Sequence, residues 1–142
     1  MLFRSSLIVA ALAISTAAQA HPDVRVNFTE AVAAVFPDYG PAQVEAISWN
    51  AWVESRYQPC VVSAKGDEGL FQWRGPRRRA LHRFSGVPMG NCVPTLTQVR
   101  FMRQEWESMG RAHGAFMRAQ NQHQAYRILR TVYGKSLPLS RS

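Results

Sequence analysis

Apolar side chains recur at helical spacing along most of the chain. The first such stripe follows Asn27, and Glu30 three residues later completes the spacing of a capping box, so Asn27 is the predicted N-cap. Residues 41–56 begin with Pro41, which suits the first turn of a helix, and carry apolar residues on several sides. Because such an element is usually buried, we expect it to be the central helix of the domain.

The rest of the chain predicts further helices separated by loops. Residues 57–69 contain Pro59 and the turn signal "KGDEG", so a loop is expected there. Later helices are predicted at residues 77–84, 95–110 with a threonine cap, 112–120 and 122–133. These elements predict one mainly α-helical domain over residues 21–134, with little or no β-structure, followed by a tail at residues 135–142.

The first twenty residues have the features of a secretory signal peptide. Arg4 supplies a positive charge, residues 7–14 form an apolar run, and residues 18–20 form a small-x-small cleavage site. The run is shorter than the roughly 20 residues that a membrane span needs. We therefore expect residues 1–20 to be removed, and the mature protein to be periplasmic or secreted without a transmembrane segment.

The charge of the chain narrows the range of partners. It has 17 lysines and arginines against 9 acidic residues, a formal net charge of +8, which favours anionic partners. An exported protein rarely meets nucleic acid, so a cell-wall polymer or a membrane surface is expected instead. The arginines at 77–79 point in several directions on a helix, which indicates exposed charge rather than a specific site.

Cys60 and Cys92 are the two cysteines of the chain. An even number in an oxidising compartment indicates a disulfide. Two free thiols or a metal site are the alternatives, although two ligands alone make a poor zinc site. The histidines at 82, 113 and 123 lack the i, i+4 spacing of a metal-binding helix, so neither a metal nor a cofactor is expected.

Glu54 is a carboxylate at the C-terminal end of the apolar second helix. It follows Asn50 by one helical turn and therefore shares the apolar face of that helix. Desolvation and the negative end of the helix dipole both favour the protonated form that a general acid needs. The alternative is a solvated glutamate at a helix end.

Residues 41–106 carry a series of short motifs. In chain order they are Glu54-Ser55, Tyr57, Pro59, a Gly-x-x-Gly-Leu-x-Gln run at residues 66–72, Trp73, an arginine-bearing segment at residues 77–81, and a Gln-x-x-Phe-x-x-x-Glu pattern at Gln98, Phe101 and Glu105. Together these motifs resemble the lysozyme superfamily. The resemblance is closest to phage tail lysozyme domains, and more distant to lytic transglycosylases and goose-type lysozyme.

The resemblance implies a lysozyme-like fold and cleavage of the β-1,4 bond between N-acetylmuramic acid and N-acetylglucosamine in peptidoglycan. It implies that Glu54 protonates the glycosidic oxygen. The residues that we place at the substrate are Ser55, Tyr57, Gln72, Trp73 and Tyr126. Among them, Ser55 is expected to act by hydrogen bonding rather than as a nucleophile. Trp73 offers a sugar-stacking face or else packs in the core, and Tyr126 matches the tyrosine motif of transglycosylases only faintly.

Asp67 and Glu68 are the nearby acids that could serve as a second carboxylate. If one of them positions water, hydrolysis follows. If neither does, the muramyl acetamide and 6-hydroxyl complete the reaction and give a 1,6-anhydro product. Both outcomes stay open.

The expected partner is the peptidoglycan glycan strand, cut by a monomeric enzyme that could serve a secretion, conjugation or phage-like apparatus. A non-catalytic lysozyme-like wall-binding protein is the alternative, and a cationic membrane-active or nucleic-acid-binding protein is a third reading that rests on charge alone.

Overall fold

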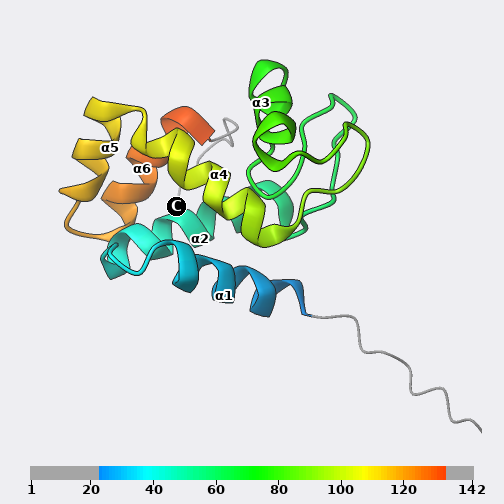
Figure 1. Ribbon diagram of the computed structural model, residues 1–142. Coiled ribbons are helices and arrows are strands. Elements are labelled where there is room, and N and C mark those ends of the chain that lie inside the picture. Colours follow the sequence, from blue (N-terminus) through cyan, green and yellow to red (C-terminus); the bar gives the residue numbers. More distant parts are fainter. Residues whose placement is uncertain (1–22, 134–142) are drawn as a thin grey trace, which may run out of the picture.

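The computed structural model describes residues 23–133, which form six α-helices and no sheet (Figure 1). The helices are α1 (Val24–Val35), α2 (Pro41–Ser55), α3 (Pro76–Ser85), α4 (Thr95–Glu107), α5 (Gly110–Met117) and α6 (Gln122–Tyr133). The prediction of a mainly helical protein with little β-structure is therefore confirmed. The predicted signal peptide, the tail and Gly134 lie outside the described residues.

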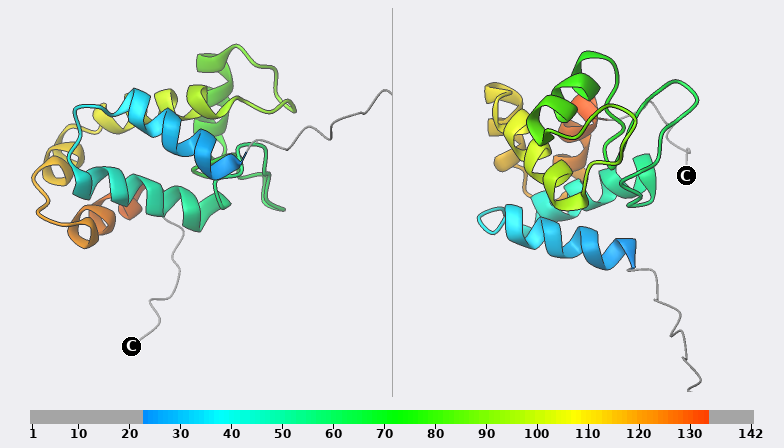
Figure 2. Two further views of the ribbon diagram at one scale, coloured as in Figure 1. Left: turned by 90° about the horizontal axis from the view of Figure 1, so that it is seen from below. Right: turned by 45° about the vertical axis from the view of Figure 1, so that its right-hand side comes forward.

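The helices pack in pairs around an aromatic core. α2 packs along α6, α1 packs on α4, and α5 covers part of α6. Figure 1 shows α5 and α6 at one end of the molecule, and α3 with the two long loops at the other; Figure 2 shows α6 beside α2 from below. Trp106 of α4 lies inside this arrangement with no exposed surface, edge-on to Phe116 and Tyr133. Trp106 thereby joins α4 to α5 and to the last turn of α6.

Two of the predicted helix caps are wrong. α1 begins earlier than predicted, because the Asp23 carboxylate accepts a hydrogen bond from the backbone N–H of Arg25 at 2.9 Å. Asn27 lies inside the helix. α4 has Pro94 as its N-cap and no side-chain cap, so Thr95 is its first helical residue. Aspartate and asparagine are about equally good caps, and the pattern alone could not choose between Asp23 and Asn27.

α2 buries one face rather than several. Its buried residues are Gln43, Ala46, Ile47, Asn50, Ala51 and Ser55. Trp49 and Trp52, by contrast, are 46% and 38% exposed. The Arg56 guanidinium lies 4.4 Å from the centre of the Trp52 ring and covers part of it. The prediction that this helix is surrounded by the core is therefore wrong on the side that carries the two tryptophans.

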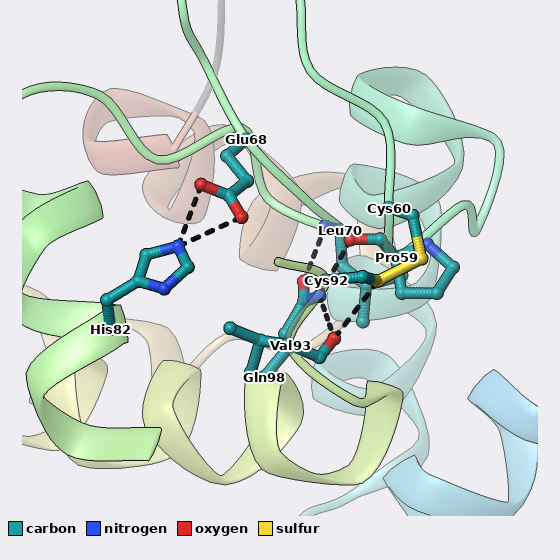
Figure 3. Close-up of a disulfide and its surroundings, with 8 residues drawn as sticks. All are labelled: Pro59, Cys60, Glu68, Leu70, His82, Cys92, Val93 and Gln98. Atoms are coloured by element: carbon teal, nitrogen blue, oxygen red, sulfur yellow. Dashed lines mark hydrogen bonds and ion pairs between the residues drawn. A yellow bond between two sulfur atoms is a disulfide. The ribbon is translucent and has the colours of Figure 1, made fainter. Parts of the chain in front are cut away.

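A disulfide joins the two long loops. Cys60 and Cys92 are bonded, with Cα atoms 5.0 Å apart, which confirms the predicted bridge and excludes the two free thiols (Figure 3). The bridge closes a loop of 32 residues that includes α3. Cross-linking a loop of this length removes about 3 to 4 kcal/mol of chain entropy from the unfolded state in the chain-entropy model.

The Gln98 side chain fastens the same loops to α4. Its Oε1 accepts a hydrogen bond from the Leu70 N–H at 2.8 Å, and its Nε2 donates to the carbonyl oxygens of Pro59 and Val93 at 2.8 and 2.7 Å (Figure 3). Gly69 makes room for the amide, because a Cβ there would lie 2.3 Å from Oε1. Gly69 of the Gly-x-x-Gly-Leu-x-Gln run and Gln98 of the Gln-x-x-Phe-x-x-x-Glu pattern therefore belong to one structural contact.

We expect Gln98→Leu to lower the free energy of unfolding by about 3 kcal/mol, because a buried N–H and two carbonyl groups lose their partner. Urea unfolding measures this change. The control is Gln104→Leu, on the exposed side of the same helix, which should change stability little. Equal unfolding midpoints for the two variants would show that the Gln98 contacts do not hold the loops.

Candidate active-site cleft

A cleft of about 670 Å³ opens where the C-terminal end of α2 meets the loop after Val62 and the end of α6. Its lining residues are Glu54, Ser63, Ala64, Lys65, Asp67, Phe71, Gln72, Arg74, Arg77, Val132 and Tyr133. The volume lies within the roughly 300 to 1,000 Å³ typical of small-molecule sites. Glu54 and Gln72, which the sequence predicts as site residues, thus line one cavity.

Glu54 is half-buried in the last turn of α2, at the negative end of the helix dipole. The helix stops immediately afterwards, because Arg56 and Tyr57 adopt left-handed backbone conformations, with φ of 53° and 62°. The Ser55 hydroxyl lies 3.0 Å from the Leu70 carbonyl oxygen and 2.9 Å from that of Ala51. These contacts hold the end of α2 against the loop that carries Gln72.

Ser55 is 6% exposed and contacts only backbone carbonyls in its hydrogen bonds. Its hydroxyl supports the end of α2 by hydrogen bonding, and Ser55 is not among the residues that line the cleft.

Gln72 lines the same cleft as Glu54 and has a strained backbone conformation. Its φ is 51°, and its side-chain Nε2 donates a hydrogen bond to the Gly69 carbonyl oxygen at 3.0 Å. Within residues 23–133, Arg56, Tyr57 and Gln72 are the three non-glycine residues with positive φ. All three are found where α2 and the loop meet. Such conformations persist only where the surrounding structure imposes them, and they concentrate at functional sites.

Asp67 borders the cleft but is held by an arginine. Both of its carboxylate oxygens accept hydrogen bonds from Arg74, at 2.5 Å to Nε and 2.8 Å to Nη2. Only 1% of the Asp67 surface is exposed. The same interaction raises the pKa of Arg74. Asp67 and Arg74 therefore line the cleft as an ion pair, and Arg74 is the more exposed of the two.

Glu68 faces the other way, into the protein. It is 3% exposed, pairs with Arg78, and has its two carboxylate oxygens 2.9 and 3.0 Å from His82 Nε2 (Figure 3). It is absent from the cleft lining. Glu68, one of the two possible second carboxylates, thus lies outside the cleft and anchors α3 to the loop.

The aromatic residues predicted at the substrate lie elsewhere. Trp73 has no exposed surface, and its indole Nε1 donates a hydrogen bond to Glu105 at 3.0 Å. Trp73 therefore packs in the core, the second of the two roles expected for it, and no face of its ring is open to a sugar in this structure. Tyr57 stacks on Phe28 with ring centres 4.7 Å apart and does not line the cleft. Tyr126 lines a neighbouring groove.

Glu105 forms a network at the rear of the cleft that the sequence did not reveal. Its carboxylate accepts hydrogen bonds from Arg77 at 2.8 and 2.6 Å, from the Tyr133 hydroxyl at 2.6 Å, and from Trp73. Burial on its own would raise the pKa of this carboxyl, but the bonds from Arg77, Tyr133 and Trp73 hold it below its usual range. Arg77 and Tyr133 also line the cleft.

The interpretation of residues 77–79 as exposed, non-specific charge is correspondingly wrong for two of the three arginines. Arg77 binds Glu105 and the Val132 carbonyl oxygen, and Arg78 binds Glu68. Arg79 is exposed. The sequence does contain a sign that Glu105 is not exposed. Glu105 follows Phe101 by four residues and so shares the side of α4 that carries this aromatic residue.

Comparison of the chain with protein-family models, curated proteins and solved structures gives no match. The lysozyme-like resemblance therefore rests on the motifs of the chain. Within residues 23–133, no group of three or more histidine, cysteine or acidic side chains is arranged to hold a metal ion. No helix of this part of the chain is long and apolar enough to cross a bilayer.

The lowered pKa of Glu105 predicts a pH-dependent stability. A group whose pKa is lower in the folded state stabilises the protein above its ordinary pKa, and this stabilisation is lost as the pH falls through the folded value. We expect Glu105→Gln to lower the free energy of unfolding by about 1 to 3 kcal/mol at neutral pH. The difference should shrink below pH 4.5, the ordinary value for this carboxyl.

Urea unfolding at several pH values measures this difference, with Glu30→Gln on the exposed side of α1 as the control. A Glu105→Gln deficit that stays constant down to strongly acidic pH would contradict the charged network.

Proposed function

We propose that this protein cleaves the glycan strand of peptidoglycan at the β-1,4 bond between N-acetylmuramic acid and N-acetylglucosamine, with Glu54 as the general acid. The observation that carries the proposal is the position of Glu54, half-buried at the end of α2 in a cleft that it shares with Gln72. The motif resemblance supplies the substrate class. The cavity supplies enough room for sugar rings.

In the proposed reaction Glu54 gives its proton to the glycosidic oxygen as the bond to the muramyl C1 breaks. An oxocarbenium-like centre forms at C1, and the leaving sugar departs with its new hydroxyl group. The proposal requires that Glu54, which is half-buried in the last turn of α2, carries its proton when the strand binds. Gln72, which lines the same cleft, would contact a hydroxyl or acetamide group of the sugar.

The environment of Asp67 favours an intramolecular second step. The acid is 1% exposed and both its oxygens bond Arg74, so it is poorly placed to activate a water molecule. Glu68 is withdrawn into the core. In the proposed second step the muramyl acetamide oxygen stabilises C1, and the 6-hydroxyl oxygen then bonds to C1 while its proton returns to Glu54. The product is a 1,6-anhydro sugar, formed without water.

The positive lining of the cleft suits an acidic wall polymer. Lys65, Arg74 and Arg77 all border the cavity. The disulfide fits an oxidising compartment, which makes the periplasm or the outside of the cell the proposed location. Passage of a secretion, conjugation or phage-like apparatus through the wall is the proposed use of such an activity.

We expect Glu54→Gln to reduce release of soluble muropeptides from purified peptidoglycan by at least about 100-fold, the usual contribution of a general acid. Mass spectrometry of the wild-type digest should show 1,6-anhydro muramyl ends. Glu45→Gln, an exposed substitution on the same helix, is the control and should digest normally.

Reducing muramyl ends would instead show that water completes the reaction. A wild-type protein that co-sediments with peptidoglycan but releases nothing would contradict the enzyme proposal in favour of a non-catalytic wall-binding protein.

A further inference from the structure

A second groove, of about 820 Å³, lies between α2 and α6. Its walls include Trp49 from α2 and His123, Tyr126, Arg127 and Arg130 from α6. No acidic side chain is among the described residues that line it. The groove therefore combines aromatic surface with two permanent positive charges.

This groove and the Glu54 cleft follow one another along the same pair of helices. On α6, Arg130 of the groove precedes Tyr133 of the cleft by three residues, or about one turn. On α2, Trp49 of the groove precedes Glu54 of the cleft by five residues, or roughly one and a half turns. Burial raises the pKa of the Tyr126 phenol, Arg130 opposes this rise, and the Glu54 carboxylate adds to it. Tyr126 is thus within electrostatic reach of Glu54.

The groove offers the groups that a carboxylate-bearing peptide requires. Arginine presents a planar fork of donors that matches a carboxylate, and two arginines one turn apart can hold two such groups. Trp49 is 46% exposed, which leaves an aromatic face for the apolar parts of a chain. A bare, uncharged sugar strand would leave Arg127 and Arg130 without ionic partners.

We propose that the α2–α6 groove binds the acidic peptide carried by the peptidoglycan strand, while the sugars of that strand occupy the Glu54 cleft. This inference rests on the proposed function for its substrate class. Its own support is the positive lining of the groove and its position beside the cleft. The protein would accordingly prefer peptide-bearing glycan to glycan from which the peptides have been removed.

The test is calorimetric binding by the Glu54→Gln protein, which should hold the ligand without turnover. The two probes are a disaccharide tetrapeptide from peptidoglycan and a peptide-free N-acetylglucosamine oligomer. Adding Arg127→Gln and Arg130→Gln should weaken binding of the peptide-bearing probe about tenfold, since charged hydrogen bonds are lost. Binding of the peptide-free oligomer should not change.

The matched control adds Arg111→Gln and Arg118→Gln, which remove the same charge from exposed positions near α5. Selective loss in the groove variant supports the inference, even if the wild type releases no muropeptides and the proposed function fails. Equal weakening in both variants, or none in either, overturns it. If the wild type cleaves peptidoglycan and the groove variant binds both probes as the control does, the inference fails while the proposed function stands.

Discussion

The buried amide of Gln98 is the contact on which the candidate site depends most. Three backbone groups from three separate segments bond to this one side chain, at Pro59, Leu70 and Val93. Two isolated β-bridges, Val62 with Glu68 and Glu68 with Trp73, join neighbouring parts of the first two segments, and the amide ties both segments to the third. Because Leu70 leads directly to Gln72, the position of the cleft wall opposite α2 follows from this contact.

The parts of the structure that depend on local pattern could be predicted from the sequence. Helical periodicity locates all six helices of residues 23–133, and the compartment argument pairs Cys60 with Cys92. Glu54 at the end of α2 was also predictable, because its neighbours define the helix and Pro59 follows soon after. These features need only the nearest residues in the chain.

Orientation in the tertiary structure could not be predicted in this way. Asp67 and Glu68 are adjacent acids in one turn, yet Asp67 borders the cleft and Glu68 faces α3. They differ because Asp67 pairs with Arg74, whereas Glu68 pairs with Arg78 of α3. Hydrophobicity likewise does not distinguish the fully buried Trp73 from the exposed Trp49 and Trp52. Periodicity does not show which tryptophan is covered, whereas in the structure Trp73 packs against Phe71 and against Phe101 of α4.

The arginines of this protein differ in whether an acid lies beside them. Arg77 and Arg78 neutralise buried acids and stabilise the fold, whereas Arg127 and Arg130 have no acid beside them in the groove lining. These arginines therefore form two groups with different physical roles, and the paired group adds nothing to the net charge. The first is internal and sets the shape of the cleft. The second faces outward along α6, where an acidic polymer could bind.

The most direct measurement of the central claim is a crystal structure of the Glu54→Gln protein with a peptidoglycan tetrasaccharide. The account predicts that the sugars lie in the cleft, with a glycosidic oxygen about 3 Å from the side chain at position 54, the distance that proton transfer requires. Density for the strand on another face, or in the cleft with no glycosidic oxygen near position 54, would contradict the assignment of Glu54 as the acid.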